Sequence, residues 1–206
     1  TLFPYTTLFR FISRNVYSSI SVDDRRESAK IVDYLIGLGH TRIAILVAEA
    51  EEQSIGLLRL EGYCDALRAH GLEVNPKLIY ETKDELNHFS MENGYQSTKK
   101  LLECGESFTA LYAVADALAI GALRALYEAG LRVPDDISLA GDDGIDMANY
   151  TVPSLTTMRQ PVEEMAKHTT RLLFDIIAGK TQHQHIIYEA ELKIKESTKS
   201  LRTKNL

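Results

Sequence analysis

Apolar residues near the start of the chain recur with the period of a helix. Four apolar or small residues fall at i, i+3, i+4 and i+7 and so share one face: Ser28, Ile31, Val32 and Leu35. The segment before them, Ser21–Asp24, ends in carboxylates that can accept hydrogen bonds from the free N–H groups of a first helical turn. The pattern predicts an amphipathic helix that ends at Gly39.

From there to residue 141, short apolar runs alternate with longer helical stretches. Strands are predicted at 42–47, 78–81, 109–114 and 137–141, and helices at 54–71, 91–104 and 116–129. Strands separated by helices are typical of βαβ units, which form a parallel sheet with helices on both faces. The fold class predicted is therefore α/β, with a doubly wound parallel sheet.

The last part of the chain has a different pattern. Pro161 to Ala178 is predicted to be a helix, with proline at its first position and Gly179 as its stop. Its apolar stripe consists of Val162, Met165, Ala166, Thr169, Leu172, Leu173 and Ile176. Residues 183–198 are predicted to hold one returning strand, and residues 199–206 a frayed polar tail. Residues 1–10 fit no pattern downstream, and we interpret them as a translated adaptor scar.

Composition narrows the class of protein. Hydrophobic residues make up 45% of the 206 residues, enough for a core, and the net charge of −6 argues against bulk nucleic-acid binding by this chain itself. Cys64 and Cys104 have neither a metal-site nor a disulfide-framework spacing, so a reducing cytoplasm is expected. We expect no membrane span and no secretory signal, since neither kind of apolar segment is evident.

Acidic residues gather where the strand at 137–141 ends. Asp142, Asp143 and Gly144 follow that strand, and ligands of open α/β sheets bind just beyond the carboxyl ends of strands. His183 and His185 share a strand face, but a third ligand is not near in sequence, so we expect neither a metal nor another cofactor. The sequence contains no nucleophile elbow or P-loop, and we do not expect an enzyme.

Several motifs in register carry a family resemblance, which covers the chain from about Phe11 to Thr198. The chain resembles the sugar-responsive transcriptional repressors of the LacI/GalR family. The motifs are Gly141–Gly144, where Asp142 replaces the usual aromatic residue, Pro153–Pro161, Val22–Asp24, Leu38–Ala44, Arg59–Tyr63 and Gly130–Ser138.

The resemblance implies an effector domain like a periplasmic sugar-binding protein, with ligand between two lobes. Residues 21–157 then correspond to the second lobe, with the strand in 183–198 returning to it. Residues 158–182 correspond to a crossover and a helix of the first lobe, residues 1–20 to the scar and a remnant of that lobe, and 199–206 to a tail. We therefore expect a fragment, in which the DNA-binding headpiece and most of the first lobe are missing.

The resemblance also implies effector-binding residues, each of which has a simpler interpretation. Arg59 and Asp143 are expected to contact the effector and to face one shared crevice, but Arg59 could instead be a surface residue paired with Glu61 or Glu52. The simpler interpretation of an acidic residue just after this strand is a turn residue that stabilises its own backbone. This interpretation suits Asp142 and Asp146 better than Asp143.

Two further places in the motifs correspond to family contacts. Ala115 and Asp116 occupy the place of an Asn-Asp pair; Ala115 offers no side-chain hydrogen bond, and Asp116 is most simply a helix N-cap. Gln160, at the junction of the lobes, is a possible contact but equally a hinge or cap residue.

Together these features predict the effector-sensing part of a cytoplasmic LacI/GalR-type transcriptional regulator. Its partners would be a small sugar or sugar derivative, DNA through the missing headpiece only, and a second copy in a homodimer. The alternative is a secreted sugar-binding protein of a transport system, which has the same fold. The motifs at Arg132–Asp136 and Leu155–Pro161 favour the regulator.

Overall fold

The computed structural model describes residues 18–48, 54–82, 88–182 and 184–201. The expected scar at 1–10, the lobe remnant up to residue 17, and His183 lie outside the described residues. The helices are α1 (Asp24–Gly37), α2 (Ile55–Ala69), α3 (Met91–Leu102), α4 (Asp116–Glu128) and α5 (Val162–Ile177), with short 3-10 turns at Pro76–Leu78 and Asp146–Asn149. The strands are β1 (Ser19–Val22), β2 (Ile43–Ala48), β3 (Ile79–Thr82), β4 (Ala110–Ala113), β5 (Ser138–Asp143), β6 (Thr156–Arg159), β7 (His185–Tyr188) and β8 (Glu191–Lys193).

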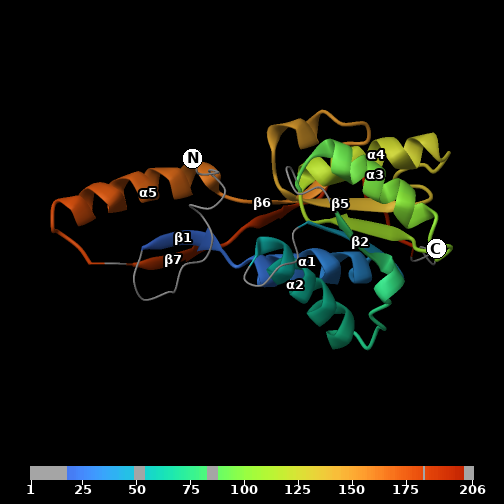
Figure 1. The fold of residues 1–206 in the computed structure, drawn as a ribbon, viewed down its shortest axis with the longest axis horizontal. Helices are drawn as coiled ribbons and strands as arrows, with labels where there is room; N and C mark the ends of the chain where they lie inside the picture. The colour runs from blue at the N-terminus through green and yellow to red at the C-terminus, as the bar shows by residue number, and fades with distance from the viewer. Residues whose placement is uncertain (1–17, 49–53, 83–87, 183, 202–206) are drawn as a thin grey trace, which may run out of the picture.

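The main lobe is a six-stranded sheet between two pairs of helices. Its strand order is β3-β2-β4-β5-β6-β8, with all pairs parallel except β6 and β8, which are antiparallel. Helices α1 and α2 cover one face and α3 and α4 the other (Figure 1). The predicted α/β fold with a doubly wound, mostly parallel sheet is confirmed.

Helix starts in the main lobe are fixed by side chains that satisfy free backbone N–H groups. Asp23 accepts from the N–H of Arg26 and thereby caps α1, as the sequence predicts. Ser54 caps α2 by accepting from the N–H of Leu57. These caps set where each helix leaves its strand, and therefore which residues lie at the carboxyl edge of the sheet.

The core of the main lobe lies in the central strands. All six residues of β2 and all four of β4 are buried, which agrees with the near-continuous apolar runs expected of strands covered on both faces. Ile31, Val32 and Leu35, predicted to share one face of α1, have no exposed surface.

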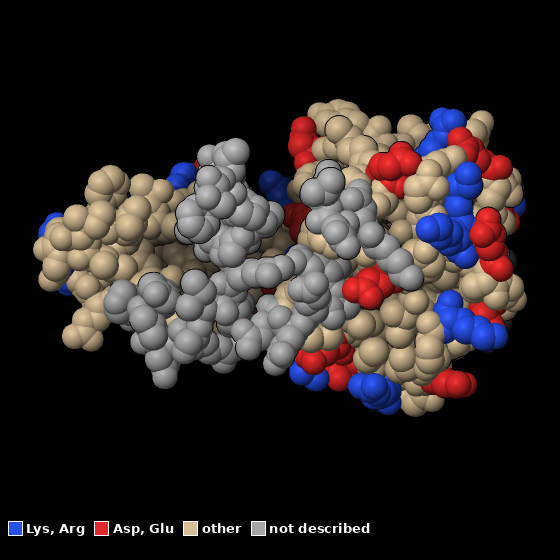
Figure 2. Space-filling model, viewed as in Figure 1, with Lys and Arg blue, Asp and Glu red and all other residues tan. Residues whose placement is uncertain are grey.

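A smaller unit projects from this lobe. We call it the arm: helix α5 and the two-stranded parallel sheet of β1 and β7, which lie together at one end of the molecule (Figure 1). His168 of α5 contacts Tyr188 of β7 through a hydrogen bond of 2.8 Å and an edge-to-face ring contact. On the part of the arm that Figure 2 leaves uncovered, few acidic or basic side chains are visible, whereas both signs are interspersed over the main lobe.

Three sequence expectations are corrected here. The single strand expected in 183–198 is two strands: β7 pairs with β1 in the arm, and β8 pairs with β6 in the main sheet. The chain passes from one sheet to the other at residues 189–190, so one continuous strand cannot serve both. The main sheet thus has six strands: the four predicted along residues 42–141, β6, and β8, which is the part of the predicted returning strand that joins this lobe.

The start of the predicted tail is also not frayed. The backbone N–H of Lys199 donates to Ser138 Oγ, and its carbonyl accepts from Nε2 of the buried His40 ring at 3.1 Å. Leu201 donates its N–H to the carbonyl of Leu38 at 2.8 Å. These backbone bonds hold residues 199–201 against the main lobe, and residues 202–206 lie outside the described part of the chain.

Candidate functional site

The carboxyl end of β5 and the first turns of α2 meet at one edge of the main sheet. Asp143 is the last residue of β5, and Arg59 lies in the second turn of α2. Arg59 Nη1 and Asp143 Oδ1 are 3.3 Å apart, and both residues line one crevice of about 330 Å³. The expectation that these two residues face a shared crevice is confirmed.

Arg59 is buried rather than on the surface, because only 4% of it is exposed. Its guanidinium contacts three carboxylates: Nε and Nη2 lie 2.9 Å from Asp24 Oδ1, Nη2 lies 3.5 Å from Asp142 Oδ1, and Nη1 contacts Asp143. Nη1 also donates to the carbonyl of Val114, the residue just after β4. The interpretation of Arg59 as a surface residue paired with Glu61 is wrong.

Arg59 does not pair with Glu61 because of the way that side chains of α1 and α2 meet at the surface. Glu61 pairs instead with Arg25 of α1, with 3.0 Å between Oε2 and Nη1. Glu52, the other acid considered, lies outside the described residues. Burial of an arginine requires that its charge be met by acids, and the acids that meet the charge of Arg59 come from α1 and β5.

Asp142 is not a turn residue but a buried residue of β5. Only 2% of it is exposed, and Tyr112 of β4 donates its hydroxyl to Asp142 Oδ2 at 3.0 Å. Burial raises the pKa of Asp142 to about 7, opposed by the charge of Arg59 and reinforced by the neighbouring carboxylate of Asp143. A carboxylate therefore occupies a core position behind the crevice.

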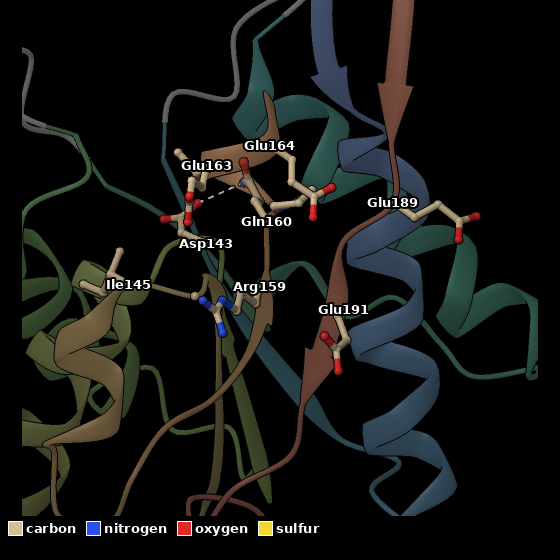
Figure 3. Close-up of a pocket in the computed structure, with 11 residues that line it drawn as sticks. Asp143, Ile145, Arg159, Gln160, Glu163, Glu164, Glu189 and Glu191 are labelled. Atoms are coloured by element: carbon tan, nitrogen blue, oxygen red, sulfur yellow. Dashed lines mark hydrogen bonds between the residues drawn. The ribbon is translucent and has the colours of Figure 1, made fainter. Parts of the chain in front are cut away.

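Asp143 is the acid that reaches the crevice. Its side chain is 36% exposed, and Gln160 Nε2 donates to its Oδ1 at 3.4 Å (Figure 3). Burial raises the pKa of Asp143, and the charge of Arg59 opposes that shift. The residue has a positive φ of 116°, an uncommon conformation that turns the chain sharply into Gly144.

Asp116 lies behind the crevice and is not the N-cap of α4. Ala115 occupies the cap position, where no side-chain cap bond is made. The fully buried carboxylate of Asp116 accepts from Thr157 Oγ1 at 2.6 Å and from the N–H of Ile145 at 2.8 Å. Burial raises its pKa to about 6, and the hydrogen bond from Thr157 opposes that shift. Asp116 thereby joins the loop after β5 to strand β6.

The space that Asp116 occupies exists because residue 141 is glycine. A Cβ at Gly141 would lie 2.3 Å from Asp116 Oδ1, so any larger residue would displace the carboxylate. The glycine of the Gly-acid-acid motif at the end of β5 therefore has a steric cause within the lobe.

The crevice wall combines the polar groups with apolar side chains. Besides Arg59, Asp143 and Gln160, the lining consists of Ile55, Phe89, Ala115, Ala117 and Ile145. Ala115 is among these lining residues, whereas Ile55, Phe89, Ala117 and Ile145 were not predicted from the sequence. Their positions just after strands or at helix starts are the signal that points to the same edge of the sheet.

A larger hollow of about 760 Å³ lies on the other side of Asp143, Ile145 and Gln160. It opens between the main lobe and the first turn of α5 (Figure 3). Charged side chains on its wall are Arg159, Glu163, Glu164, Glu189 and Glu191. The crevice and this hollow share three residues and so form one junction between the main lobe and the arm.

Within the described ranges, no group of three or more histidine, cysteine or acidic residues has the arrangement of a metal site. A helix long and apolar enough to cross a membrane is likewise absent from the part of the chain that the structure describes.

Comparison with known proteins places these features in a family. Residues 32–198 match the family model described as a periplasmic binding protein-like domain. MalR of Clostridium butyricum, an HTH-type transcriptional regulator, is 32% identical over 192 residues, which are 89% of this chain and 53% of MalR. AscG of Escherichia coli, also an HTH-type transcriptional regulator, is 38% identical over 177 residues, 85% of this chain and 51% of AscG. This chain thus spans about half the length of these curated relatives.

Solved structures of related regulators have the same fold as this chain. The crystal structure of the repressor AscG matches with a TM-score of 0.80 and 34% identity, over 93% of this chain and 68% of that one. A LacI-family regulator from Enterococcus faecium with bound ribose matches with a TM-score of 0.82 and 30% identity, over 94% of this chain and 69% of that one. Through its periplasmic binding protein-like domain, the chain belongs to the LacI/GalR family of transcriptional regulators.

Proposed function

We propose that this chain is the effector-sensing part of a DNA-binding transcriptional regulator and that it binds a small sugar-like molecule at the junction between the main lobe and the arm. The observation that carries the proposal is the Arg59–Asp143 pair at the carboxyl edge of the sheet. Relatives named as regulators, one of them with bound ribose, support it. The alternative, a secreted transport component, has no support among the relatives described above.

Sensing requires that the ligand favour one arrangement of the protein over another. Gln160 follows β6 and precedes α5, so it lies where the chain leaves the main lobe for the arm. A ligand held by Asp143 and Gln160 would contact both units at once, and its affinity would differ between arrangements of the arm. That difference in affinity would favour one arrangement of a DNA-binding headpiece over another. The protein would contact DNA through that headpiece alone.

The proposed setting is the cytoplasm, without catalytic activity and without a cofactor. We propose a homodimer for the intact regulator, because apolar side chains are exposed at one end of α4 and in the loop before β6. Tyr127, Tyr150 and Val152 are 76%, 78% and 91% exposed. An apolar hollow of about 560 Å³ beside Leu123, Tyr127 and Val152 would accept the same residues from a second copy.

Sedimentation of the double variant Tyr127→Glu, Val152→Glu tests the dimer. Wild-type chain is expected to associate with rising concentration, and the variant to remain monomeric. Association that is unchanged in the variant would place the interface elsewhere.

Binding is tested by NMR titration of the amide resonances with D-ribose, D-glucose and D-galactose. At least one sugar is expected to shift the amides of Gly144, Ile145 and Gln160, with a dissociation constant in the roughly millimolar range, because exposed hydroxyl contacts contribute only about 0.5–1.5 kcal/mol each. Asp143→Asn is the matched variant and should weaken the binding at least about tenfold. If no sugar in a broad panel shifts these amides, the proposed function is wrong.

A further inference from the structure

We propose that Asp116 is a positioning residue for the effector crevice: its buried carboxylate holds the turn at residues 143–145 against β6, and effector binding depends on its negative charge. This inference rests on the proposed function and deepens it, because it names a residue that shapes the site without contacting the ligand and that makes binding sensitive to pH. We call residues 143–145 the β5 turn.

The β5 turn forms part of both cavities at the junction. Asp143 and Ile145 line the crevice and the larger hollow alike, and Gly144 lines the larger hollow (Figure 3). Asp116 is not among the described residues that line either cavity. An effect of Asp116 on the effector must therefore pass through the turn.

The backbone of the β5 turn is strained. Asp143 has a φ of 116° and Gly144 a φ of 74°. Glycine adopts positive φ readily, but a residue with a Cβ seldom does, and such a conformation persists only where the surrounding structure enforces it. The turn therefore needs hydrogen bonds that hold it from outside.

The carboxylate of Asp116 and the hydroxyl of Thr157 supply these bonds. Asp116 Oδ2 accepts from the N–H of Ile145 at 2.8 Å, and Oδ1 accepts from Thr157 Oγ1 at 2.6 Å. The same Thr157 oxygen accepts from the N–H of Gly144 at 3.3 Å. Two consecutive N–H groups of the turn are thus tied to α4 and β6.

The negative charge of Asp116 strengthens these ties. Hydrogen bonds to an ionised acceptor are roughly twice as strong as bonds between neutral groups. Protonation removes the charge and converts one carboxylate oxygen into an O–H donor, so that the bonds from Thr157 and Ile145 cannot both remain as they are. The neutral acid would keep its place in the core but hold the turn less firmly.

The charge of Asp116 changes in an accessible pH range. Burial raises the pKa of Asp116 to about 6, opposed by the hydrogen bonds from Thr157 and Ile145 and reinforced by the charge of Asp143. Lys195, which follows β8, is the base whose charge interacts with Asp116. Effector affinity should therefore be complete above about pH 7 and fall as the pH drops through about 6.

Asp116→Asn tests the dependence on charge, because asparagine keeps the shape of the side chain and cannot ionise. Binding is measured by NMR titration at pH 5, 6, 7 and 8, with whichever of D-ribose, D-glucose and D-galactose binds the wild type most tightly. At pH 8 the variant should bind at least about fivefold more weakly than wild type, because its bonds to the turn are neutral. At pH 5, where Asp116 is protonated in the wild type, the two should agree within about twofold.

The ratio of the two dissociation constants is the quantity that decides. Asp142 and Asp143 also titrate, but both are present in wild type and variant, so their direct effects on binding largely cancel in the ratio. A purely structural role of Asp116 would give a ratio that does not change with pH.

Thr157→Val removes the tie from β6 and has a matched control in Thr98→Val. Both threonines are buried, but the hydroxyl of Thr98 donates to the carbonyl of Gly94 within α3. At pH 8, Thr157→Val should weaken binding at least about threefold, and Thr98→Val should change it less than about twofold. Circular dichroism checks that each variant is folded.

The wild type alone provides a further readout. The amide resonance of Ile145 reports the titration of Asp116, because this N–H donates to its carboxylate. Since the ionised form binds more tightly, saturating sugar should lower the midpoint of this titration by at least about 0.5 on the pH scale. Thr157→Val should raise the midpoint, because the hydrogen bond that it removes lowers the pKa of Asp116.

These results separate the inference from the proposed function. If none of the sugars binds the wild type at any pH, the proposed function fails and the inference fails with it. If a sugar binds, but Asp116→Asn binds it as tightly as wild type at pH 8 or with a ratio that is constant with pH, the proposed function stands and the inference is overturned. Should Asp116→Asn not fold, an Ile145 midpoint unchanged by the sugar would overturn it equally.

Discussion

The main lobe and the arm are both built from strongly patterned apolar sequence, yet they bury it to very different degrees. Leu46 in β2 and Leu111 in β4 have no exposed surface. In α5 only Leu172 is buried, while Leu173 and Phe174 remain 55% and 65% exposed. Hydrophobic periodicity identifies the face of a helix that can be covered; the covering elements decide whether that face contributes to stability.

The largest expected effect comes from matched leucines in the two regions. Leu46→Ala removes a fully buried side chain and should lower the free energy of unfolding by about 2–5 kcal/mol, through lost burial and the cavity left behind. Leu173→Ala removes an exposed one and should change it by less than about 0.5 kcal/mol. Urea unfolding followed by circular dichroism measures both. Similar losses in the two variants would show that α5 is packed as tightly as the central strands.

The close contact of α3 and α4 gives the next comparison. A Cβ at Gly121 of α4 would lie 1.9 Å from the carbonyl oxygen of Met91 in α3, whereas a Cβ at Gly37 of α1 meets nothing within 4 Å. Gly121→Ala should therefore destabilise the chain by about 1–3 kcal/mol, as overpacking does. Gly37→Ala should stabilise it by up to about 1 kcal/mol, because alanine lowers the entropy of the unfolded chain.

Thermal and urea unfolding of these two alanine variants should move in opposite directions. A Gly121→Ala variant as stable as the wild type would mean that the two helices can separate at little cost, and would contradict the tight packing of this face of the main lobe.

The last comparison concerns the pH dependence of stability that the acids behind the crevice produce. Burial raises the pKa of Asp142 from its ordinary 3.8 to about 7, so the native state binds this proton more tightly than the unfolded state does. The stability contributed by the protonated form is complete below about pH 4 and is lost as the pH rises to about 7. Asp142→Asn should therefore gain about 1–3 kcal/mol relative to wild type between pH 4.5 and pH 8.

The exposed Asp135 provides a contrast of opposite sign. The hydrogen bond from Lys199 lowers the pKa of Asp135, so its stabilising contribution is present above its ordinary pKa and is lost as the pH falls. Asp135→Asn should accordingly lose stability relative to wild type as the pH rises toward about 4, and the difference should stay constant above that pH. For Asp142→Asn, the contradicting result is a stability difference from wild type that stays constant between pH 4.5 and pH 8. That result would mean that Asp142 is ionised in the native state throughout this range.

Most of the main lobe could be predicted from local sequence. Caps such as Ser54 and apolar faces such as Ile31–Leu35 act within a few residues, so periodicity and capping rules suffice to place those helices. The division of residues 183–198 between two sheets could not be predicted in this way. It depends on which distant strands, β1 and β6, are available as partners.

The candidate site, too, could be predicted from local sequence only where its contacts do not depend on distant residues. The resemblance identifies Arg59 and Asp143, and strand ends indicate that they are near each other. The surroundings of Arg59 depend on Asp24, 35 residues away in the sequence, and on Asp142, 83 residues away. Sequence spacing therefore located the residues of the site. It assigned Asp116 to a helix cap and Asp142 to a turn, and both assignments were wrong because the hydrogen-bond partners of these acids, Thr157 and Tyr112, come from other strands.

A crystal structure of the chain with the tightest-binding neutral hexose tests the central claim most directly. The account predicts a sugar hydroxyl within about 2.7–3.2 Å of an Asp143 carboxylate oxygen, at the junction between the main lobe and the arm. A sugar bound away from Asp143 would contradict it.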